Sequence, residues 1–313
     1  MPVLPCLVRI LRLLSSAVPT YAGGMQAPLS YHLTSGDSAA ANLRAAGVPG
    51  TIHVWHDVLY EGTHEPGWPC AETLCLRARM LEDHTGGGVS FQKALKALRD
   101  QYAGLRAAAD RPIVLWFDAC LFDQSMLVHL LACLRDRPAE SVSLVCIDAC
   151  PGLTRYNGLG ELSPERFTEH YPRRAPVTPS MFGFATEADA AFGHHDGTAL
   201  RRLASLTDAP LPHVPAAAAR RLLEFPDPET GLGRLEQLVL QALGDGPATP
   251  GRLFRSVADL DTPPQYWGDT TLWQIVNGLA LRRPPLVRIA GPTPRLPLWP
   301  GQGDYDTYII ELA

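Results

Sequence analysis

Carboxylate side chains follow each of four apolar segments in the first half of the chain, and they are the residues best suited to chemistry. These acids are Asp37, Asp57, Glu61, Asp118, Asp123 and Asp148. If the segments are parallel strands, the acids lie at the carboxyl edge of one sheet, where ligands of such sheets bind. Acids gathered in one cleft repel one another unless they are protonated, hydrogen-bonded or bound to a cation. Mg²⁺ and Mn²⁺ take oxygen ligands of this kind, so either ion is a candidate cofactor.

The candidate residues divide into two groups by the role that their chemistry suggests. Asp118 ends the most hydrophobic apolar run and has no structural task visible in the sequence, so it is the first candidate. His56 could act as a general base or a metal ligand because imidazole titrates near neutral pH, although a lone histidine at a strand end is more often solvated. The catalytic candidates are Asp118, Asp57, His56 and Glu61, and the ligand-binding candidates are Gly36, Asp37, Ser38, Asp123 and Gln124.

Several of these residues also have a purely structural or weaker chemical interpretation. Asp37 and Asp123 stand at expected helix starts, where an N-cap aspartate contributes about 1 kcal/mol. Gly36, Asp37 and Ser38 form a motif similar to the nucleophile block of a family of serine hydrolases. The later blocks of that family are absent, so Ser38 is a poor candidate for a catalytic nucleophile. The spacings Cys70-x₄-Cys75 and Cys146-x₃-Cys150 do not match a zinc ribbon, so structural zinc is not expected.

Strands and helices alternate over residues 29–155, which predicts βαβ units and a small parallel sheet with flanking helices. The runs VLWF and SLVCI are almost entirely apolar, as expected of central strands covered on both faces. The expected strands are 30–34, 51–55, 112–117 and 142–147, and the expected helices are 38–46, 71–84, 91–109 and 123–135.

The rest of the chain predicts three further parts. Residues 1–28 are expected to be a disordered extension or the product of a misassigned start codon, with a secretion signal as the minor alternative because Arg9 and Arg12 interrupt its apolar stretch. Residues 156–228 predict a wholly helical segment and a linker, with helices starting at Ser163-Pro164 and Thr178-Pro179. Residues 229–313 predict three helices, the second starting at Thr249-Pro250, and a hairpin of 286–290 with 296–299, the order of a winged helix-turn-helix.

The third helix of this C-terminal part lacks the chemistry of a DNA-reading helix. It reads TTLWQIVNGLAL and has no basic residue before Arg282 and Arg283. Arg288 and Arg295 would add only a small basic patch to a part of the chain in which acids outnumber arginines. We therefore expect this helix to pack against the N-terminal half or a protein partner, including another copy of the chain, rather than against nucleic acid.

Composition excludes several classes of protein. The 313 residues are 46% hydrophobic and carry a formal charge of −5, which excludes a disordered chain and a general electrostatic affinity for nucleic acid or anionic membranes. No window after residue 28 approaches the length of a membrane span. Cysteines such as Cys133 and Cys146 lie in apolar runs, which is typical of reduced thiols and predicts a cytoplasmic protein.

Four motifs in the first half resemble those of a bacterial family, the domain of unknown function number 1835. They are HLTSGDSAA (32–40), GTIHVWHDVLYEG (50–62), VLWFDACLFDQSMLVHLLACL (114–134) and GLGELSPE (158–165). The tail, from GLGRLEQLVLQAL to YWGDTTLWQIVNGL, resembles the companion domain of unknown function number 3658. The resemblance implies an α/β fold and a bacterial cytoplasmic setting, and it implies no activity. Relatives carry Glu-His-Asp where this chain has Asp118, Ala119 and Cys120.

Two classes of function follow from these observations. The first is an enzyme whose carboxylate-lined pocket acts, with a divalent cation as an option, on a small polar or phosphorylated molecule. The second is a ligand-sensing or regulatory protein whose winged helix contacts a partner. If Asp37, Asp57, Glu61 and Asp118 line one pocket, the enzyme is favoured, whereas dispersed acids favour the regulatory protein.

Overall fold

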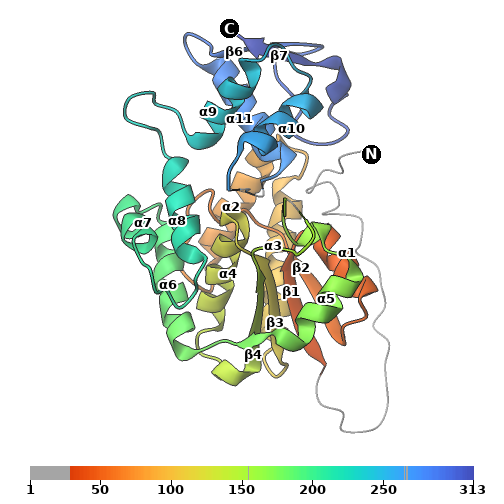
Figure 1. Cartoon of the computed structure of the whole chain (residues 1–313), viewed down its shortest axis with the longest axis vertical. Coiled ribbons are helices and arrows are strands. Elements are labelled where there is room, and N and C mark those ends of the chain that lie inside the picture. The colour runs from red at the N-terminus through yellow and green to blue at the C-terminus, as the bar shows by residue number, and fades with distance from the viewer. Residues whose placement is uncertain (1–28, 154, 264, 266) are drawn as a thin grey trace.

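A five-stranded sheet lies in the middle of the molecule (Figure 1). The computed structural model describes residues 29–153, 155–263, 265 and 267–313, so the extension expected over residues 1–28 lies outside the described residues. The strand order is β2-β1-β3-β4-β5, with the first four strands parallel. This confirms the expected parallel α/β sheet, and the strand order reverses between β1 and β3. The strands are β1 (Ser30–Ser35), β2 (Gly50–Trp55), β3 (Ile113–Asp118), β4 (Val142–Ile147) and β5 (Ala175–Pro176).

The fifth strand departs from the expectation that residues 161–225 are wholly helical. β5 is two residues long and pairs antiparallel with β4, with Ala175 opposite Leu144. The pairing covers the edge that β4 would otherwise present to solvent, which protects a sheet from pairing with another chain. Sequence periodicity cannot detect so short a strand.

Helices cover both faces of the sheet because side chains alternate along β3. Ile113, Leu115 and Phe117 pack in one core with residues of α3 and α4, whereas Val114 and Trp116 pack in another with residues of α1 and α5. This alternation explains why β3 is apolar at nearly every position. The helices of this half are α1 (Asp37–Ala45), α2 (Ala71–His84), α3 (Phe91–Ala107), α4 (Leu121–Leu134) and α5 (Pro164–His170).

Three helices of the middle segment extend the first core. They are α6 (Pro179–Gly193), α7 (Gly197–Ala204) and α8 (Val214–Leu223), and they lie on the same side of the sheet as α4 (Figure 1). α5, α6 and α10 begin at the prolines expected from the sequence, and the Thr178 hydroxyl accepts a hydrogen bond from the Met181 N–H at 3.3 Å. Single turns of 3₁₀ helix occur at Ala139–Ser141, Leu159–Glu161, Tyr171–Arg173 and Tyr305–Thr307.

The C-terminal part has its own hydrophobic core, formed by residues between 232 and 310. Its elements are α9 (Arg234–Leu243), α10 (Pro250–Leu260), α11 (Asp269–Leu281), β6 (Val287–Ala290) and β7 (Ile309–Leu312). An isolated bridge between Ala248 and Ile310 places a third short extended segment beside β7. The order of elements is the expected one, and the winged-helix assignment itself stays a prediction.

The expected pairing of 286–290 with 296–299 is wrong. β6 pairs antiparallel with β7, with Val287 opposite Leu312. Pro297 has no N–H to give to a ladder, and the neighbouring Leu296 N–H instead donates to Asn277 Oδ1 at 2.7 Å. In contrast, Ile310 in β7 is fully buried between the exposed Ile309 and the half-buried Glu311, which is an alternation that suits a strand.

Polar contacts join the C-terminal part to the N-terminal half. α11 lies against α2, where the Thr271 hydroxyl is 3.4 Å from His84 Nε2 and the Gln274 amide donates to the Asp83 carbonyl at 3.4 Å. No helix in the described part of the chain is both long and apolar enough to cross a membrane.

Candidate functional site

The predicted site residues lie at the carboxyl edge of the sheet, but the structure does not bring them into one pocket. Asp118 lines a cleft of about 480 Å³ beyond β3 and β4, which we call the Asp118 cleft. Asp57, with Gly36 and His56, lines a separate cavity beyond β1 and β2. Glu61 lines a third hollow between these two. Asp37 lines none of the three and lies beside His56, so the four acids are dispersed around the point where the strand order reverses.

Asp118 and Asp123 form a buried carboxyl pair at the end of β3. Asp118 Oδ1 accepts the Cys120 N–H at 2.8 Å, and Asp123 Oδ2 accepts the Asp118 N–H at 2.6 Å. Burial raises the pKa of Asp118 against the opposing effect of the hydrogen bonds from Cys120. Burial, with the Asp118 charge beside it, raises the pKa of Asp123 well above its ordinary value. Asp123 is thus the proton-holding member of the pair, and Asp118 is the member that reaches the cleft.

The structural role expected for Asp123 is wrong in its detail. The N-cap of α4 is Cys120, and Asp123 is the third residue of the helix, from which its carboxyl group reaches back to the Asp118 N–H. Gln124 supports the same turn by donating to the Asp118 carbonyl oxygen at 2.5 Å. Because the Asp118 carboxyl group itself accepts the Cys120 N–H, Asp118 does have a structural contact, contrary to the expectation that it had none. Asp123 and Gln124 were candidates for ligand binding, and both side chains are buried, with 1% of each exposed.

The other walls of the Asp118 cleft come from α8 and the C-terminal part. α8 contributes His213 and Arg220, and the start of α9 contributes Arg234. The Arg220 guanidinium is occupied by ion pairs with Glu224 and Asp261. Arg234 has no ion-pair partner in the part of the chain that the structure describes. Further lining residues are Ala119, Asp148, Tyr156, Asn157, Gly158, Thr262, Pro263 and Gln265.

Asp57 and Glu61 are each held by a basic side chain of α2. The Arg77 guanidinium pairs with the Asp57 carboxylate, both side chains are buried, and Arg77 also donates to the Val58 carbonyl oxygen at 2.9 Å. Glu61 Oε2 lies 3.1 Å from His84 Nδ1. These contacts fasten the loop after β2 to α2, so both acids have a structural function that their positions in sequence did not reveal.

His56, Asp37 and Ser38 lie together at the ends of β1 and β2. His56 Nε2 is 3.5 Å from Asp37 Oδ1. The expected N-cap role of Asp37 is wrong, because Gly36 occupies the N-cap of α1 with a φ of 73°, a left-handed conformation that favours glycine. Ser38 is exposed on the first turn of α1.

The Asp118–Asp123 pair does not fit Mg²⁺ or Mn²⁺. The side chain within ligand distance of both carboxyl groups is the Cys120 thiol, a soft donor whose pKa is raised well above its ordinary value by burial and by Asp118. Asp118, Cys120 and Asp123 are 5%, 8% and 1% exposed, so an ion held between all three side chains would be shielded from most of the waters that Mg²⁺ retains. The raised pKa values of both acids favour protonation, which relieves their mutual repulsion without a cation.

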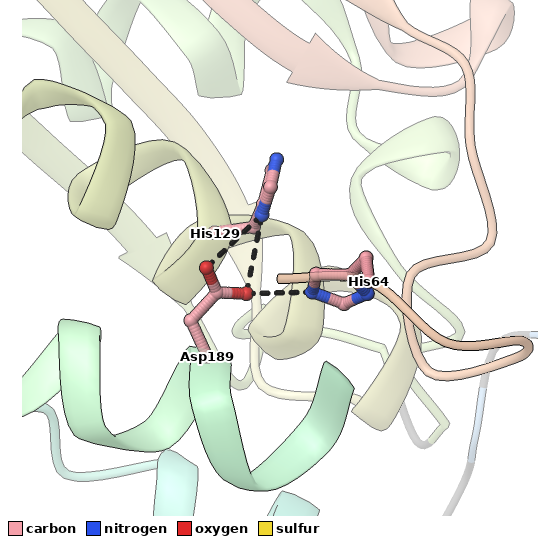
Figure 2. A group of neighbouring side chains, drawn as sticks. All are labelled: His64, His129 and Asp189. Carbon is pink, nitrogen blue, oxygen red and sulfur yellow. Dashed lines mark hydrogen bonds and ion pairs between the residues drawn. The ribbon is translucent and has the colours of Figure 1, made fainter. Parts of the chain in front are cut away.

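A second cluster, which the sequence did not indicate, joins His64, His129 and Asp189 (Figure 2). His64 comes from the loop after β2, His129 from α4 and Asp189 from α6, and each is at most 4% exposed. His64 Nε2 is 2.8 Å from Asp189 Oδ1, and His129 Nδ1 is 3.1 Å from Asp189 Oδ2. The Gly67 N–H donates to Asp189 Oδ2 at 2.8 Å, and the Tyr102 hydroxyl lies 2.7 Å from His129 Nε2.

The protonation of this cluster follows from burial and from the partners of each group. Although burial alone lowers the pKa of His129, the Asp189 carboxylate raises it well above its ordinary value. Although burial alone raises the pKa of Asp189, the charge and hydrogen bonds of His129 and His64 hold it well below its ordinary value. Burial lowers the pKa of His64, which is therefore neutral and donates through Nε2.

Chemically, the cluster is an ion pair that fastens three elements together. Two imidazoles and a carboxylate can ligate a transition metal, but such a catalytic metal also needs a site for water or substrate. Asp189 and His129 are 0% and 1% exposed, so a water bound there could not exchange with substrate. His129 lies in the apolar helix LFDQSMLVHLLACL, and a histidine at such a position is expected to be an ordinary core residue. No local pattern in the sequence predicts its contact with Asp189.

An α/β fold of this kind occurs in proteins with many unrelated functions, so the fold and the two clusters do not by themselves identify a function. No protein-family model matches the chain, and no curated protein is similar to it in sequence. The resemblance to families 1835 and 3658 stays a prediction. The carboxyl pair at the Asp118 cleft is therefore the arrangement that best combines a reactive group with access for a ligand.

Proposed function

We propose that the protein is an enzyme that binds a small molecule with an anionic group in the Asp118 cleft and exchanges a proton with it through Asp118. The observation that carries this proposal is the Asp118–Asp123 carboxyl pair, in which a buried, proton-holding acid lies beneath an acid that reaches a cleft of about 480 Å³. Two carboxyl groups with separated pKa values are an established arrangement for acid–base chemistry. No metal is needed for this step.

Recognition of an anion is supported by Arg234 and by the N-terminus of α8. Arg234 presents a guanidinium without an ion-pair partner among the described residues, and His213 stands at the N-terminus of α8. Guanidinium groups and helix N-termini are favourable partners for phosphate and carboxylate groups. A small phosphorylated molecule or a carboxylic acid is therefore the class of substrate that we propose.

A regulatory function is the second candidate, and two observations favour it. Asp37, Asp57, Glu61 and Asp118 do not line one pocket, which by the sequence criterion favours a regulatory protein, so the enzyme proposal rests on the Asp118–Asp123 pair alone and not on convergence of the four acids. The walls of the Asp118 cleft come from the sheet, from α8 and from the C-terminal part, so a bound ligand would touch all three. Such a ligand would change the free energy of association between these parts of the chain. In a winged helix, α11 would be the helix that reads DNA, but here it packs against α2 within the same chain. We therefore propose protein rather than nucleic acid as the regulatory target.

Thermal unfolding with inorganic phosphate, AMP or succinate tests the binding part of the proposal. A ligand at 100 times its Kd adds about 2.7 kcal/mol, so at least one of the three should raise the Tm of the wild type by several degrees. Arg234→Met should abolish the increase, and Asp136→Asn, which alters an exposed acid away from the cleft, should preserve it. The proposal is wrong if none of the three anions changes the Tm, or if Arg234→Met responds as the wild type does.

The role of Asp118 is tested by proton uptake and by the stability of Asp118→Asn. An anion placed beside Asp118 favours its protonated form, so calorimetric titration in two buffers should show protons taken up by the wild type and none by Asp118→Asn. Without ligand, Asp118→Asn should be at least as stable as the wild type, because the amide can still accept the Cys120 N–H. Loss of about 1–3 kcal/mol with proton uptake intact would make Asp118 a structural residue.

A further inference from the structure

The hollow that Glu61 lines lies where the N-terminal half meets the C-terminal part, and it is large enough for a small molecule. We call it the Arg221 hollow. Its volume is about 200 Å³. Its apolar walls belong to the two hydrophobic cores and to side chains packed against them: Tyr60, Leu121, Phe122, Leu235, Trp267 and Ile275.

Two arginines and two glutamates also line the Arg221 hollow, and three of these four side chains have partners. Glu224 pairs with Arg220. Glu61 Oε2 lies 3.1 Å from His84 Nδ1. Arg221 differs, because among the described residues it has no ion-pair partner, and its Nε is buried without a hydrogen-bond partner. The positive charge of Arg221 is therefore the one in this wall that lacks a direct counter-charge.

The Arg221 side chain is held in place without being neutralised. Its guanidinium carbon lies 4.7 Å from the centre of the Phe225 ring, a cation–π contact that supplies no oxygen acceptor. Burial lowers the pKa of Arg221, although Glu224 and Glu61 act in the opposite direction. A half-buried guanidinium in this state gains from an oxyanion partner, and a carboxylate matches the geometry of its N–H groups.

The apolar walls of the hollow determine which body the anion carries. Tyr60 and Phe122 meet edge to face with their ring centres 6.4 Å apart, and Trp267 lines the same hollow. Aromatic rings make favourable edge-to-face and offset contacts with other rings. An apolar cavity of about 150 Å³ is enough to bind benzene. A hollow of about 200 Å³ therefore has room for one aromatic ring that carries a carboxylate group.

We propose that the Arg221 hollow binds a small aromatic carboxylate. Its oxygens contact the guanidinium group, and its ring packs against Tyr60, Phe122 and Trp267. Because these walls belong to both halves of the molecule, the bound ligand strengthens the contact between the halves.

This site is separate from the one that we propose in the Asp118 cleft. Arg220 and Gln265 form a wall that the two sites share. Arg221, however, lines only the hollow, and Arg234 lines only the cleft. Variants of these two arginines therefore distinguish binding in the hollow from binding of the same carboxylate in the cleft.

Titration of the full chain with 4-fluorobenzoate, followed by ¹⁹F NMR of the ligand, tests the proposal. The uncharged 4-fluorobenzamide should bind at least about tenfold more weakly, because hydrogen bonds between charged partners are the stronger ones. Acetate, which has no ring, should not displace 4-fluorobenzoate when the two are equally concentrated. Equal affinity for the acid and the amide would overturn the role of the guanidinium, and displacement by acetate would overturn that of the aromatic walls.

Two variants and one control establish where 4-fluorobenzoate binds, and the Tm of each variant without ligand shows that it is folded. Arg221→Met removes the charge and should weaken binding at least about tenfold. Ile275→Phe adds volume at a half-buried wall position and should abolish binding. Arg234→Met, in the Asp118 cleft, should bind 4-fluorobenzoate as the wild type does.

The outcomes of these titrations decide the proposal. It is overturned if 4-fluorobenzoate does not bind the wild type at millimolar concentration, or if Arg221→Met or Ile275→Phe binds it normally. Loss of binding in Arg234→Met, with Arg221→Met unchanged, would place the carboxylate in the Asp118 cleft instead. In the reverse direction, Arg221→Met should keep any increase in Tm with phosphate, AMP or succinate that Arg234→Met abolishes, so the two proposals can fail independently.

Discussion

Buried acids in this protein are stabilised in three different ways. Asp57 is paired with Arg77, and Asp189 is paired with His129. No cation pairs with Asp123 among the described residues, and its pKa is raised well above its ordinary value by burial and by the Asp118 charge, which favours its protonated form. Because an isolated buried carboxylate is very unfavourable, each solution is required by burial. Only the third leaves an acid with a transferable proton beside an open cleft.

The ion pair of Asp189 gives the first prediction at this scale. Asp189→Asn should lower the free energy of unfolding by about 3–5 kcal/mol at pH 6, because it leaves the His129 imidazolium buried without its counter-charge. Tyr102→Phe, which removes only the hydroxyl on His129 Nε2, should lower it by about 1–3 kcal/mol. Urea denaturation measures both. If Asp189→Asn costs no more than Tyr102→Phe, His129 is not charged.

The same pair predicts how this difference depends on pH. The lowered pKa of Asp189 makes its contribution complete above about pH 4 and lost as pH falls toward that pKa. The raised pKa of His129 makes its contribution complete below about pH 6.5 and lost as pH rises toward that pKa. The gap between the wild type and Asp189→Asn should therefore be widest between these values. A gap that grows from pH 7 to pH 9 would contradict the charge assignment.

At the scale of single elements, helix starts follow local chemistry closely. α5 and α6 both begin at a proline after a hydroxyl residue, yet only Thr178 accepts a hydrogen bond from the first turn, and Ser163 makes no such bond. The two sequence signals look alike, so the structure distinguishes them where the pattern does not.

This difference predicts unequal effects of removing the two hydroxyl groups. Thr178→Ala should lower the free energy of unfolding by about 0.5–2 kcal/mol, since it leaves the Met181 N–H without its acceptor. Ser163→Ala should change it by less than about 0.5 kcal/mol. Urea denaturation of both variants decides the matter, and equal losses would show that Ser163 also caps its helix.

At the scale of the whole molecule, a buried polar contact couples the two hydrophobic cores. Asp261, at the end of α10, is fully buried, accepts the Trp267 indole N–H at 2.9 Å and pairs with Arg220 of α8. A second contact between the halves, Arg155 with Asp259, lies at the surface at 3.3 Å. Since a ligand in the Asp118 cleft would touch both halves, their coupling bears on the proposed function.

Removing the buried contact should reduce the coupling between the halves. Asp261→Asn should lower the free energy of unfolding by about 1–3 kcal/mol and broaden or split the calorimetric transition, because Arg220 then retains only Glu224. Asp259→Asn is the matched control, and its exposed pair should contribute less than about 1 kcal/mol. A single sharp transition in Asp261→Asn, with unchanged stability, would show that the halves are held by apolar packing alone.

The sequence by itself determined the elements of the parallel sheet and its flanking helices. The expected bounds of β4 and α2 agree with the structure at every residue, and those of β3 differ by one residue at each end. It also placed the acids at the carboxyl edge of a parallel sheet. These features depend on periodicity, proline positions and turn residues within a few residues of one another, so a linear pattern contains them.

Only the tertiary structure decided which side chains meet. Asp57 pairs with Arg77, twenty positions away, and Asp189 pairs with His129, sixty positions away. β6 pairs with β7 rather than with the nearer segment 296–299, which contains a proline. Such contacts depend on how helices pack across the sheet, which local patterns do not specify. Whether an acid is ionised, paired or protonated follows from those contacts. For this reason the structure separated Asp118, which lines the cleft without an ion-pair partner among the described residues, from Asp57 and Glu61, which pair with Arg77 and His84.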